Sequence, residues 1–491
     1  MNSMTNAQLK PDYFEWLAAN PLLRFLPEEL DYVGWGEYLR LEPAKEWNGP
    51  VPKAQRQRIA NHVKRAYAPT DLAIHAALGL QNLLYTGLAH RDPRLEENRR
   101  WPYQTGALLG KDLDEIPWFP TYSAGATFRG ITGCGKTACI ERFISRYRQV
   151  VVHKEREDCA WLHNKQLVYL VVPMPADGSR GGLLLEIAKR IDHLLETDYA
   201  HQLRTKYKSV EKGLVAILHW LSLHRCGLLV IEETQERHVA PEVFGADFVT
   251  FFLRMLNFGV PLALVGNPLA FAVLDTFSQD VRRFSDGGEF VFDPVSDHRS
   301  AMWRDDLVPT VWGFNVFENH DEVVVDLNKL LWDYTGGIPD ALARLRREAL
   351  FDAIRMGGSN VTRNNITKAF DSRSMRPLHP LIDAFKNKSP TMLRDFKDIP
   401  AAYFETKWKL EKAREEELKA EKAKGATNDR PDDDTGPEQS TGEVPSSARP
   451  PMPSTSQTAA PPPVAGVPGH KDRRGEQFAE DLNARRRKFD S

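Results

Sequence analysis

The chain has 491 residues, a hydrophobic share of 42% and a formal net charge of −2. Its length allows two or three folded units with a large core. The near-zero charge excludes a protein that binds nucleic acid through its overall charge, so a DNA contact would need a local patch or an assembly of several copies.

Two further features of the composition concern the cellular compartment. No apolar run approaches the roughly 20 residues that span a bilayer, and no signal peptide stands at the N-terminus. The four cysteines have no metal-type spacing and fit a reducing environment; they are Cys134, Cys139, Cys159 and Cys226. We therefore expect a cytoplasmic protein with no membrane partner.

Residues 1–105 predict an accessory or docking region that is largely helical. The first 48 residues are dense in aromatic side chains between proline and acidic residues, which is typical of either a small core or a docking surface. From residue 53 to 97, apolar side chains recur at helical spacing, as in Ile59, Val63 and Tyr67. The first of these helices is basic, which fits either a phosphate-facing patch or a solvated helix face.

A complete phosphate-loop motif, G-x-x-x-x-G-K-[ST], occupies residues 130–137. Its glycines allow backbone N–H groups to turn inward around phosphate oxygens. Lys136 would reach the β- and γ-phosphates, and the Thr137 hydroxyl would hold Mg²⁺. Apolar side chains at helical spacing follow, so the loop opens a helix whose N-terminal dipole favours anions. We predict that ATP and Mg²⁺ bind here, at Gly130, Thr132, Gly133, Cys134, Gly135, Lys136, Thr137 and Ala138.

Short apolar runs alternate with helical patterns after the loop. The runs predict buried strands over residues 166–172, 227–231, 261–266 and 289–293, with a weakly marked strand near 122–128 before the loop. Helices are predicted over residues 183–195, 210–224, 244–258 and 269–277. This alternation predicts a three-layer α/β domain over residues 106–297, with a parallel five-stranded sheet and with ligands at the carboxyl ends of its strands.

Polar residues follow several of these strands. Glu232 and Glu233 end one strand, and with a phosphate loop in the same domain we expect Glu232 to orient Mg²⁺ and Glu233 to polarise the attacking water. Asn267 ends the next strand and would either hold the γ-phosphate or that water, or begin a turn. Arg282 and Arg283 precede the last strand, where they are either an arginine finger for a neighbouring subunit or a solvated surface pair.

One stretch after the strand at 166–172 gives the chain a family resemblance. It reads Val172-Pro-Met-Pro-Ala-Asp-Gly-Ser-Arg-Gly-Gly-Leu183, followed by Ile191-Asp192, and it resembles the corresponding region of TnsC/TniB-type AAA+ transposition regulators. The likeness spans residues 70–395. The more general ATPase and lid motifs occur in the order of that family: Gly130 to Thr137, Leu229-Val-Ile-Glu-Glu-Thr-Gln235, Leu264-Val-Gly-Asn267 and Tyr334-Thr-Gly-Gly-Ile-Pro339.

The resemblance implies an AAA+ P-loop NTPase with a small helical lid, which assembles with copies of itself, as a ring or a helix, on duplex DNA. Such bacterial proteins couple a target-site selector protein to a transposase, and ATP hydrolysis controls the assembly. In that family the region after the second strand faces DNA. Arg180, Lys189 and Arg190 are therefore candidate phosphate contacts, although solvated helix charges look the same in sequence.

The sequence departs from the family at two positions. Glu232 stands at the metal-binding position where aspartate is usual, which adds one methylene of reach. Asp340 stands where many AAA+ lids place a sensor arginine. Either Arg344 or Arg346 replaces that arginine, or the contact is absent.

The remaining chain predicts a lid, a charged helix and a tail. Residues 298–395 contain helical patterns at 322–334, 339–356 and 362–370, broken by paired glycines. Residues 396–424 predict a charged helix that acts as a solvated spacer, since no heptad is sustained. Residues 425–491 predict a disordered tail that ends in a basic amphipathic motif, either a partner hook or a non-specific DNA contact.

Two other functions share these motifs. A nucleotide-gated signalling or defence ATPase would bind protein partners without DNA, and its activity would ignore added duplex. A replication loader of similar fold would need a helicase partner and an appended winged-helix domain, for which residues 400–491 leave no room.

Overall fold

The structure is a computed structural model that describes residues 12–46, 51–111, 123–234, 241–271 and 278–427. By its internal contacts the chain divides into two units, residues 1–422 and 423–491. The described part of the second unit, residues 423–427, is the helical end of α18 (Ala401–Thr427). The first unit holds the sheet and the candidate site.

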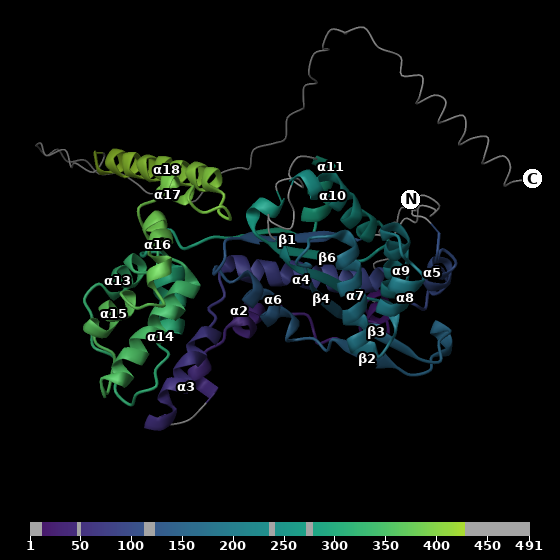
Figure 1. Ribbon diagram of the computed structural model, residues 1–491, viewed down its shortest axis with the longest axis horizontal. Helices are drawn as coiled ribbons and strands as arrows, with labels where there is room; N and C mark the ends of the chain where they lie inside the picture. The colour runs from purple at the N-terminus through teal and green to yellow at the C-terminus, as the bar shows by residue number, and fades with distance from the viewer. Residues whose placement is uncertain (1–11, 47–50, 112–122, 235–240, 272–277, 428–491) are drawn as a thin grey trace, which may run out of the picture. The chain divides into compact units, whose positions relative to one another are not determined.

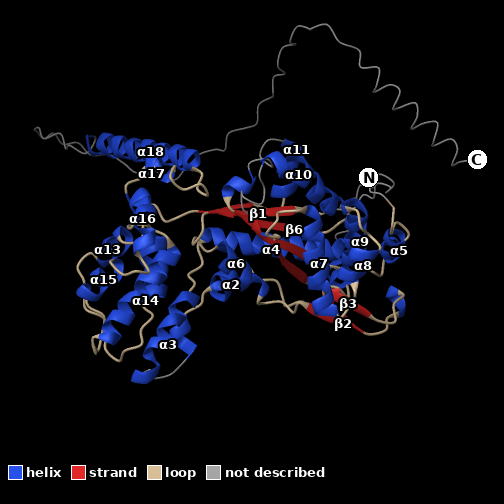
Figure 2. Cartoon of the chain, in the orientation of Figure 1, coloured by secondary structure: helices blue, strands red, loops and turns tan. Residues whose placement is uncertain are grey.

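The first unit is built on a five-stranded sheet, drawn in red in Figure 2, in which every pair of neighbouring strands is parallel. The strand order is β4-β5-β6-β1-β7, which places β1 inside the sheet between β6 and β7. The predicted parallel sheet is confirmed, including the weakly marked strand before the phosphate loop. The strands are β1 (Gly125–Gly130), β4 (Tyr169–Pro173), β5 (Leu228–Thr234), β6 (Leu262–Gly266) and β7 (Glu289–Phe292).

Helices cover both faces of the sheet and make the predicted three layers. Side chains along β5 alternate between two cores, because successive strand residues point to opposite faces. Leu228 and Val230 belong to a core with α2 (Tyr32–Leu39), α4 (Asp71–His90) and α6 (Lys136–Ile144). Leu229 and Ile231 belong to the other core, with α5 (Glu96–Gly106), α7 (Arg180–Leu195), α9 (Val210–Leu223) and α10 (Pro241–Asn257). Two helices of the N-terminal region, α2 and α4, are thus part of the core on one face of the sheet.

The apolar run predicted as one strand over residues 166–172 forms two strands. Its first part is β3 (Asn164–Leu167), which pairs antiparallel with β2 (Val150–His153) in a separate two-stranded sheet. Its second part is β4 at the end of the main sheet. The single-strand prediction was wrong because Leu167, Val168 and Leu170 are all fully buried, so the change of sheet leaves no polar mark in the sequence.

Other predicted helices match the structure within a few residues, as α7, α9 and α10 show. The segment predicted as a helix over 269–277 begins instead with a 3₁₀ turn, η8 (Pro268–Phe271), and its residues 272–277 lie outside the described residues. Short helices complete this part of the chain: α1 (Asp12–Ala18), α8 (Tyr199–Thr205) and α11 (Ser278–Ser285).

A helical lid with its own core follows β7, and Figure 1 shows its helices together in green. The segment α3 (Arg56–Ala60) and η4 (Asn61–Arg65), from far earlier in the chain, packs into this core through Ala60 and Val63. The lid comprises the π-helical turn η10 (Met302–Leu307), α12 (Val308–Trp312), α13 (Leu327–Asp333), α14 (Pro339–Arg355), α15 (Arg363–Phe370), α16 (His379–Lys386) and α17 (Pro390–Leu393).

The helix α18 is anchored at its first turns. Phe404 and Trp408, one helical turn apart, are buried against Phe385 of α16, with ring centroids 5.1 and 6.0 Å from that ring. Of the predicted disordered tail, residues 425–427 are the helical end of α18, and residues 428–491 lie outside the described residues. Among the described residues, no helix is both long and apolar enough to span a bilayer.

Candidate functional site

The phosphate-loop motif forms the turn between β1 and α6, at the carboxyl edge of the sheet. Gly130 is the last residue of β1, and Lys136 is the first of α6. A Cβ on Gly130 would lie 2.3 Å from the backbone oxygen of Phe292 in β7, so only glycine fits against that strand. Gly135, at the N-cap of α6, has a φ of +93°, which glycine adopts without strain. The loop therefore has the tight backbone path that a phosphate cradle needs.

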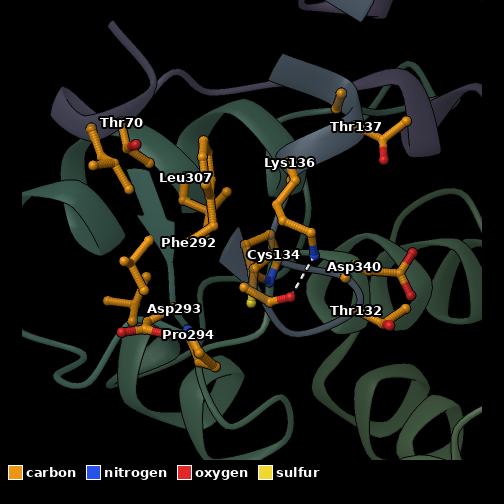
Figure 3. A pocket seen from close by; sticks show the side chains of 18 of the residues that line it. Thr70, Thr132, Cys134, Lys136, Thr137, Phe292, Asp293, Pro294, Leu307 and Asp340 are labelled. Carbon is orange, nitrogen blue, oxygen red and sulfur yellow. Dashed lines mark hydrogen bonds between the residues drawn. The ribbon is translucent and has the colours of Figure 1, made fainter. Parts of the chain in front are cut away.

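Lys136 turns its side chain back over the loop (Figure 3). Its Nζ donates hydrogen bonds to the backbone oxygens of Gly130 and Ile131, at 2.7 and 2.9 Å. Burial lowers the pKa of Lys136, because a desolvated ammonium is less stable than a solvated one. A partly desolvated ammonium held at a glycine loop favours the approach of an anion such as phosphate.

The loop forms one wall of a cavity of about 1180 Å³. Figure 3 shows Thr132, Cys134, Lys136 and Thr137 around this hollow together with side chains from β7 and the lid. Apolar and aromatic side chains line it too, contributed by the N-terminal segment, the strand ends and the lid: Tyr67, Val265, Phe292, Val295, Leu307 and Val311. A cavity with a polar phosphate loop and apolar walls fits a nucleotide, which has an anionic end and a flat aromatic end.

The two adjacent carboxylates lie within the last three residues of β5. Glu232 pairs with Pro173 of β4, and its backbone oxygen accepts a hydrogen bond from Met174 N at 2.8 Å. The pairing of β5 with β6 shifts register between Ile231 and Thr234, and such a bulge changes where side chains point. Among the described residues Glu232 is not one that lines the cavity, and the side chain of Glu233 lies outside them.

Thr137 lines the cavity, and its hydroxyl and a Glu232 carboxylate are oxygen ligands of the kind that Mg²⁺ prefers. The described residues hold no group of three or more His, Cys, Asp or Glu side chains that could enclose a metal alone. In proteins, Mg²⁺ is usually held by one or two protein oxygens together with substrate phosphates and water.

Asn267 follows β6 and is brought to the same cavity as the loop. Its Oδ1 accepts a hydrogen bond from Leu269 N at 3.0 Å, which is the turn that the sequence offered as one alternative. Its Nδ2 donates to the backbone oxygen of Asp398, just before α18. The side chain therefore takes part in a local turn and also reaches a distant segment at the cavity.

Four of the predicted arginine and lysine contacts are exposed and are not among the described residues that line the cavity. Arg282 and Arg283 are exposed on α11, and Arg283 Nη1 donates to Asn257 Oδ1 at 2.7 Å. Lys189 and Arg190 are exposed on α7, where Lys189 forms an ion pair with Glu186 at 2.6 Å. Roles toward a second subunit or toward DNA stay predictions for all four.

Arg180, the third candidate DNA contact, is the first residue of α7. The residue before it, Ser179, caps this helix by accepting a hydrogen bond from Gly182 N at 2.9 Å. Asp177 fixes the turn by accepting from both the backbone N and the hydroxyl of Ser179, at 3.1 and 2.8 Å. The Asp-Gly-Ser stretch of the family resemblance is thus the structure that starts α7, and its role toward DNA stays a prediction.

The lid touches the loop but brings no arginine into the cavity among the described residues. Asp340 N donates to Gly133 O at 3.1 Å, and its carboxylate pairs with Arg344 at 3.0 Å. Arg346 is only 1% exposed and donates to Phe314 O and to Asp321. Of the two proposed replacements for the sensor arginine, Arg346 therefore belongs to the lid core and Arg344 is held by Asp340.

Several cavity residues carried no motif in the sequence. Tyr67 comes from the N-terminal region, and Lys407 comes from α18. Asp293 follows β7 and accepts hydrogen bonds on Oδ2 from Lys407 Nζ and from the Tyr403 hydroxyl, both at 2.6 Å. Asp293 ends a predicted strand, so the rule that ligands bind at carboxyl ends could have identified it.

Comparisons with known proteins agree with this geometry. Residues 126–274, which include the loop, β5 and Asn267, match the family model described as an AAA domain. The fold is that of an AAA+ P-loop protein. No curated protein matches the sequence.

Solved structures resemble this AAA+ fold only distantly. Cdc6p from Pyrobaculum aerophilum has 15% identity and a TM-score of 0.36, over 56% of this chain and 65% of that chain. Aeropyrum pernix ORC1 in complex with DNA has 19% identity and a TM-score of 0.34, over 57% of this chain and 68% of that one. Drosophila ORC bound to DNA has 12% identity, a TM-score of 0.31 and coverage of 73% of both chains. With identities and TM-scores this low, these structures do not indicate what this chain binds.

Proposed function

We propose that this chain is an ATPase that binds Mg-ATP in the cavity at the carboxyl edge of the sheet. The observation that carries this proposal is the phosphate loop itself, with Lys136 folded over its carbonyls at the wall of a cavity of about 1180 Å³. The AAA-domain match over residues 126–274 supports the same conclusion.

The predicted site residues have separate tasks in this proposal. The backbone of residues 130–135 and Lys136 bind and orient the β- and γ-phosphates. Thr137 and Glu232 supply oxygen ligands to Mg²⁺, which when bound neutralises charge on the phosphates. Glu233 accepts a proton from the attacking water, and Asn267 orients that water or the γ-phosphate.

We further propose that the ATPase assembles on duplex DNA and acts as a transposition regulator, linking a target-site selector protein to a transposase. This rests on the resemblance of residues 172–183 to TnsC/TniB-type regulators. The exposure of Lys189 and Arg190 on α7 is compatible with DNA phosphate contacts. Arg282 or Arg283, exposed on α11, is available to a nucleotide held by a neighbouring copy.

Light scattering of the full chain with duplex DNA and a non-hydrolysable ATP analogue tests the assembly. We expect a species much larger than a dimer only when both are present. The Lys136→Ala variant should stay small under the same conditions, because it lacks the nucleotide. A wild-type chain that remains a monomer or dimer would contradict the assembly.

The alternative is a nucleotide-gated signalling or defence switch that binds protein partners without DNA. ATPase activity separates the two functions. A transposition regulator should respond to added duplex, and a charge-removing variant at Arg180, Lys189 and Arg190 should lose that response while keeping basal activity. ATPase activity that ignores duplex while a protein partner is retained would favour the switch.

A further inference from the structure

Among the described residues, the lid brings no lysine or arginine side chain to the cavity beside the phosphate loop. Asp340 contacts the loop, Arg344 forms an ion pair with Asp340, and Arg346 is buried in the lid core. Among the described residues that line the cavity, the cationic side chains are Lys64, Lys136, Lys397 and Lys407. Lys136 belongs to the loop, and Lys64 and Lys397 are exposed at the surface.

Lys407 differs from the other two because the Asp293 carboxylate, which is largely shielded from solvent, binds its ammonium. Its side chain is 30% exposed, and its Nζ donates to Asp293 Oδ2 at 2.6 Å. Asp293 is 10% exposed and directly follows Phe292, the residue that pairs with Gly130 of the loop. Lys407 therefore reaches the strand that flanks the phosphate loop.

Lys407 and Cys134 of the loop line the same cavity. Burial is the main reason that the pKa of the Cys134 thiol is raised to about 12. The charges of Lys136 and Lys407 both lower the pKa of this thiol, and Asp293 raises it. Lys407 therefore acts on the loop in the same direction as Lys136, but more weakly.

Packing of α18 against α16 fixes the position of Lys407. Phe404 and Trp408 are buried against α16, and Lys407 stands beside them on the neighbouring face. Tyr403, one turn before Lys407, gives Asp293 its second hydrogen bond. Lys409 lies on the same helix but is 75% exposed and paired with Glu405, which makes it a matched control.

We propose that Lys407 is a phosphate-contacting residue of the nucleotide site, taking from α18 the role that the lid leaves unfilled. The proposal rests on the ATP binding proposed above. Asp293 holds the ammonium at the cavity, and the several negative charges of a triphosphate attract it more strongly than one carboxylate does. Without Lys407, Asp293 would face the phosphates with its charge uncompensated, and repulsion would weaken binding.

Substitutions of the two partners of the ion pair should change the affinity for ATP in different directions. By titration calorimetry with Mg-ATP on the full chain, Lys407→Met should weaken binding by about tenfold, as expected when a charged hydrogen bond is lost. Asp293→Asn should leave binding equal or tighter, because it frees the ammonium and removes a negative charge. Lys407→Arg should bind nearly as wild type, and Lys409→Met should match wild type. Binding of AMP should change little in any of them.

Several results would overturn the proposal. If Lys407→Met and Asp293→Asn weaken ATP and AMP binding equally, the ion pair only holds α18 in place. If Lys407→Met binds ATP as wild type does, while Lys136→Ala does not bind, Lys407 has no phosphate contact and the proposed ATP site survives. If wild type does not bind ATP, both proposals fail together. Circular dichroism and thermal midpoints of the nucleotide-free variants verify that each is folded.

Discussion

The two edges of the parallel sheet both hold buried or partly buried positive charge, yet in the part of the chain that the structure describes only the carboxyl edge adds a glycine loop and a large cavity. At the amino edge, Arg91 donates to the backbone oxygens of Gly87 and Cys226, at 2.8 and 2.7 Å. Arg225 beside it donates to Asn98 O at 2.8 Å. Burial lowers the pKa of each of these arginines to about 10.

The carboxyl edge places its cation in a different setting. Lys136 is also bound by backbone oxygens, but it lies at a cavity of about 1180 Å³, whereas the cavity described at the amino edge measures about 120 Å³ and is lined by Gly87 and Pro261. A buried cation is therefore not by itself a sign of function. The glycine loop and the large adjoining space are what distinguish the carboxyl edge.

The largest expected effect is at the carboxyl edge, in the Lys136→Ala variant. It should bind ATP about 100-fold more weakly or worse, because two charged hydrogen bonds to phosphate are lost. The nucleotide-free protein should not be destabilised, since a desolvated ammonium has been removed. Titration calorimetry and a thermal midpoint measure the two effects, with Lys189→Ala on α7 as the control. If Lys136→Ala binds ATP as tightly as wild type does, the carboxyl edge is not the nucleotide site and does not differ in function from the amino edge.

A second variant at the carboxyl edge separates binding from chemistry. Glu233→Gln should bind ATP as wild type does but hydrolyse it about 100-fold more slowly, because the amide cannot accept the proton of the attacking water. A phosphate-release assay measures the rate, and light scattering should show ATP-bound assemblies that persist. If Glu233→Gln and Lys136→Ala lose nucleotide binding alike, the assignment of separate roles is wrong.

The amino edge should control stability at acidic pH. His224 is only 9% exposed, with Nδ1 3.0 Å from Lys165 O and Nε2 2.9 Å from the Tyr199 hydroxyl, and burial lowers its pKa to about 4. In the unfolded chain His224 has an ordinary histidine pKa and therefore binds a proton at a higher pH than in the folded chain. The contribution of neutral His224 to the free energy of unfolding is complete above the unfolded-state pKa, and it is lost as the pH falls from there toward the folded-state pKa.

For His224 alone, the free energy of unfolding should drop by about 2 kcal/mol between pH 7 and pH 5. Denaturant unfolding at several pH values measures this slope. Burial also lowers the pKa of His219, so that residue contributes in the same direction. His224→Gln should flatten the slope, and a slope identical to that of wild type would show that His224 does not titrate as the structure indicates.

The smallest effect is expected for Arg282→Ala and Arg283→Ala on α11. Both side chains are exposed, so each change should alter stability by less than about 0.5 kcal/mol. If one of them acts on a neighbouring subunit, its loss should lower ATPase activity only under conditions that assemble the protein. Equal activity of both variants with wild type in the assembled state would rule out this role.

The sequence predicts the carboxyl edge well where the chemistry is local. Residues 130–137 carry the glycines, the lysine and the threonine in one short run, and the neighbouring apolar strands mark the sheet. The division of residues 164–173 between β3 and β4 could not be predicted, because both strands are buried and the apolar run is unbroken.

The opposite wall of the cavity could not be predicted for a different reason. Asp293 and Lys407 are 114 residues apart, and neither local sequence predicts their contact. Tyr67 reaches the cavity from the N-terminal region, whose helices were expected to form a separate accessory part. Contacts of this kind follow from tertiary packing, which a motif does not encode.

A structure of the full chain with Mg²⁺ and a non-hydrolysable ATP analogue tests the central claim most directly. We predict a triphosphate held by the backbone of residues 130–135, with Lys136 moved from its carbonyls to the phosphates and Thr137 at the metal. An empty loop, or a nucleotide bound elsewhere on the chain, would contradict the account.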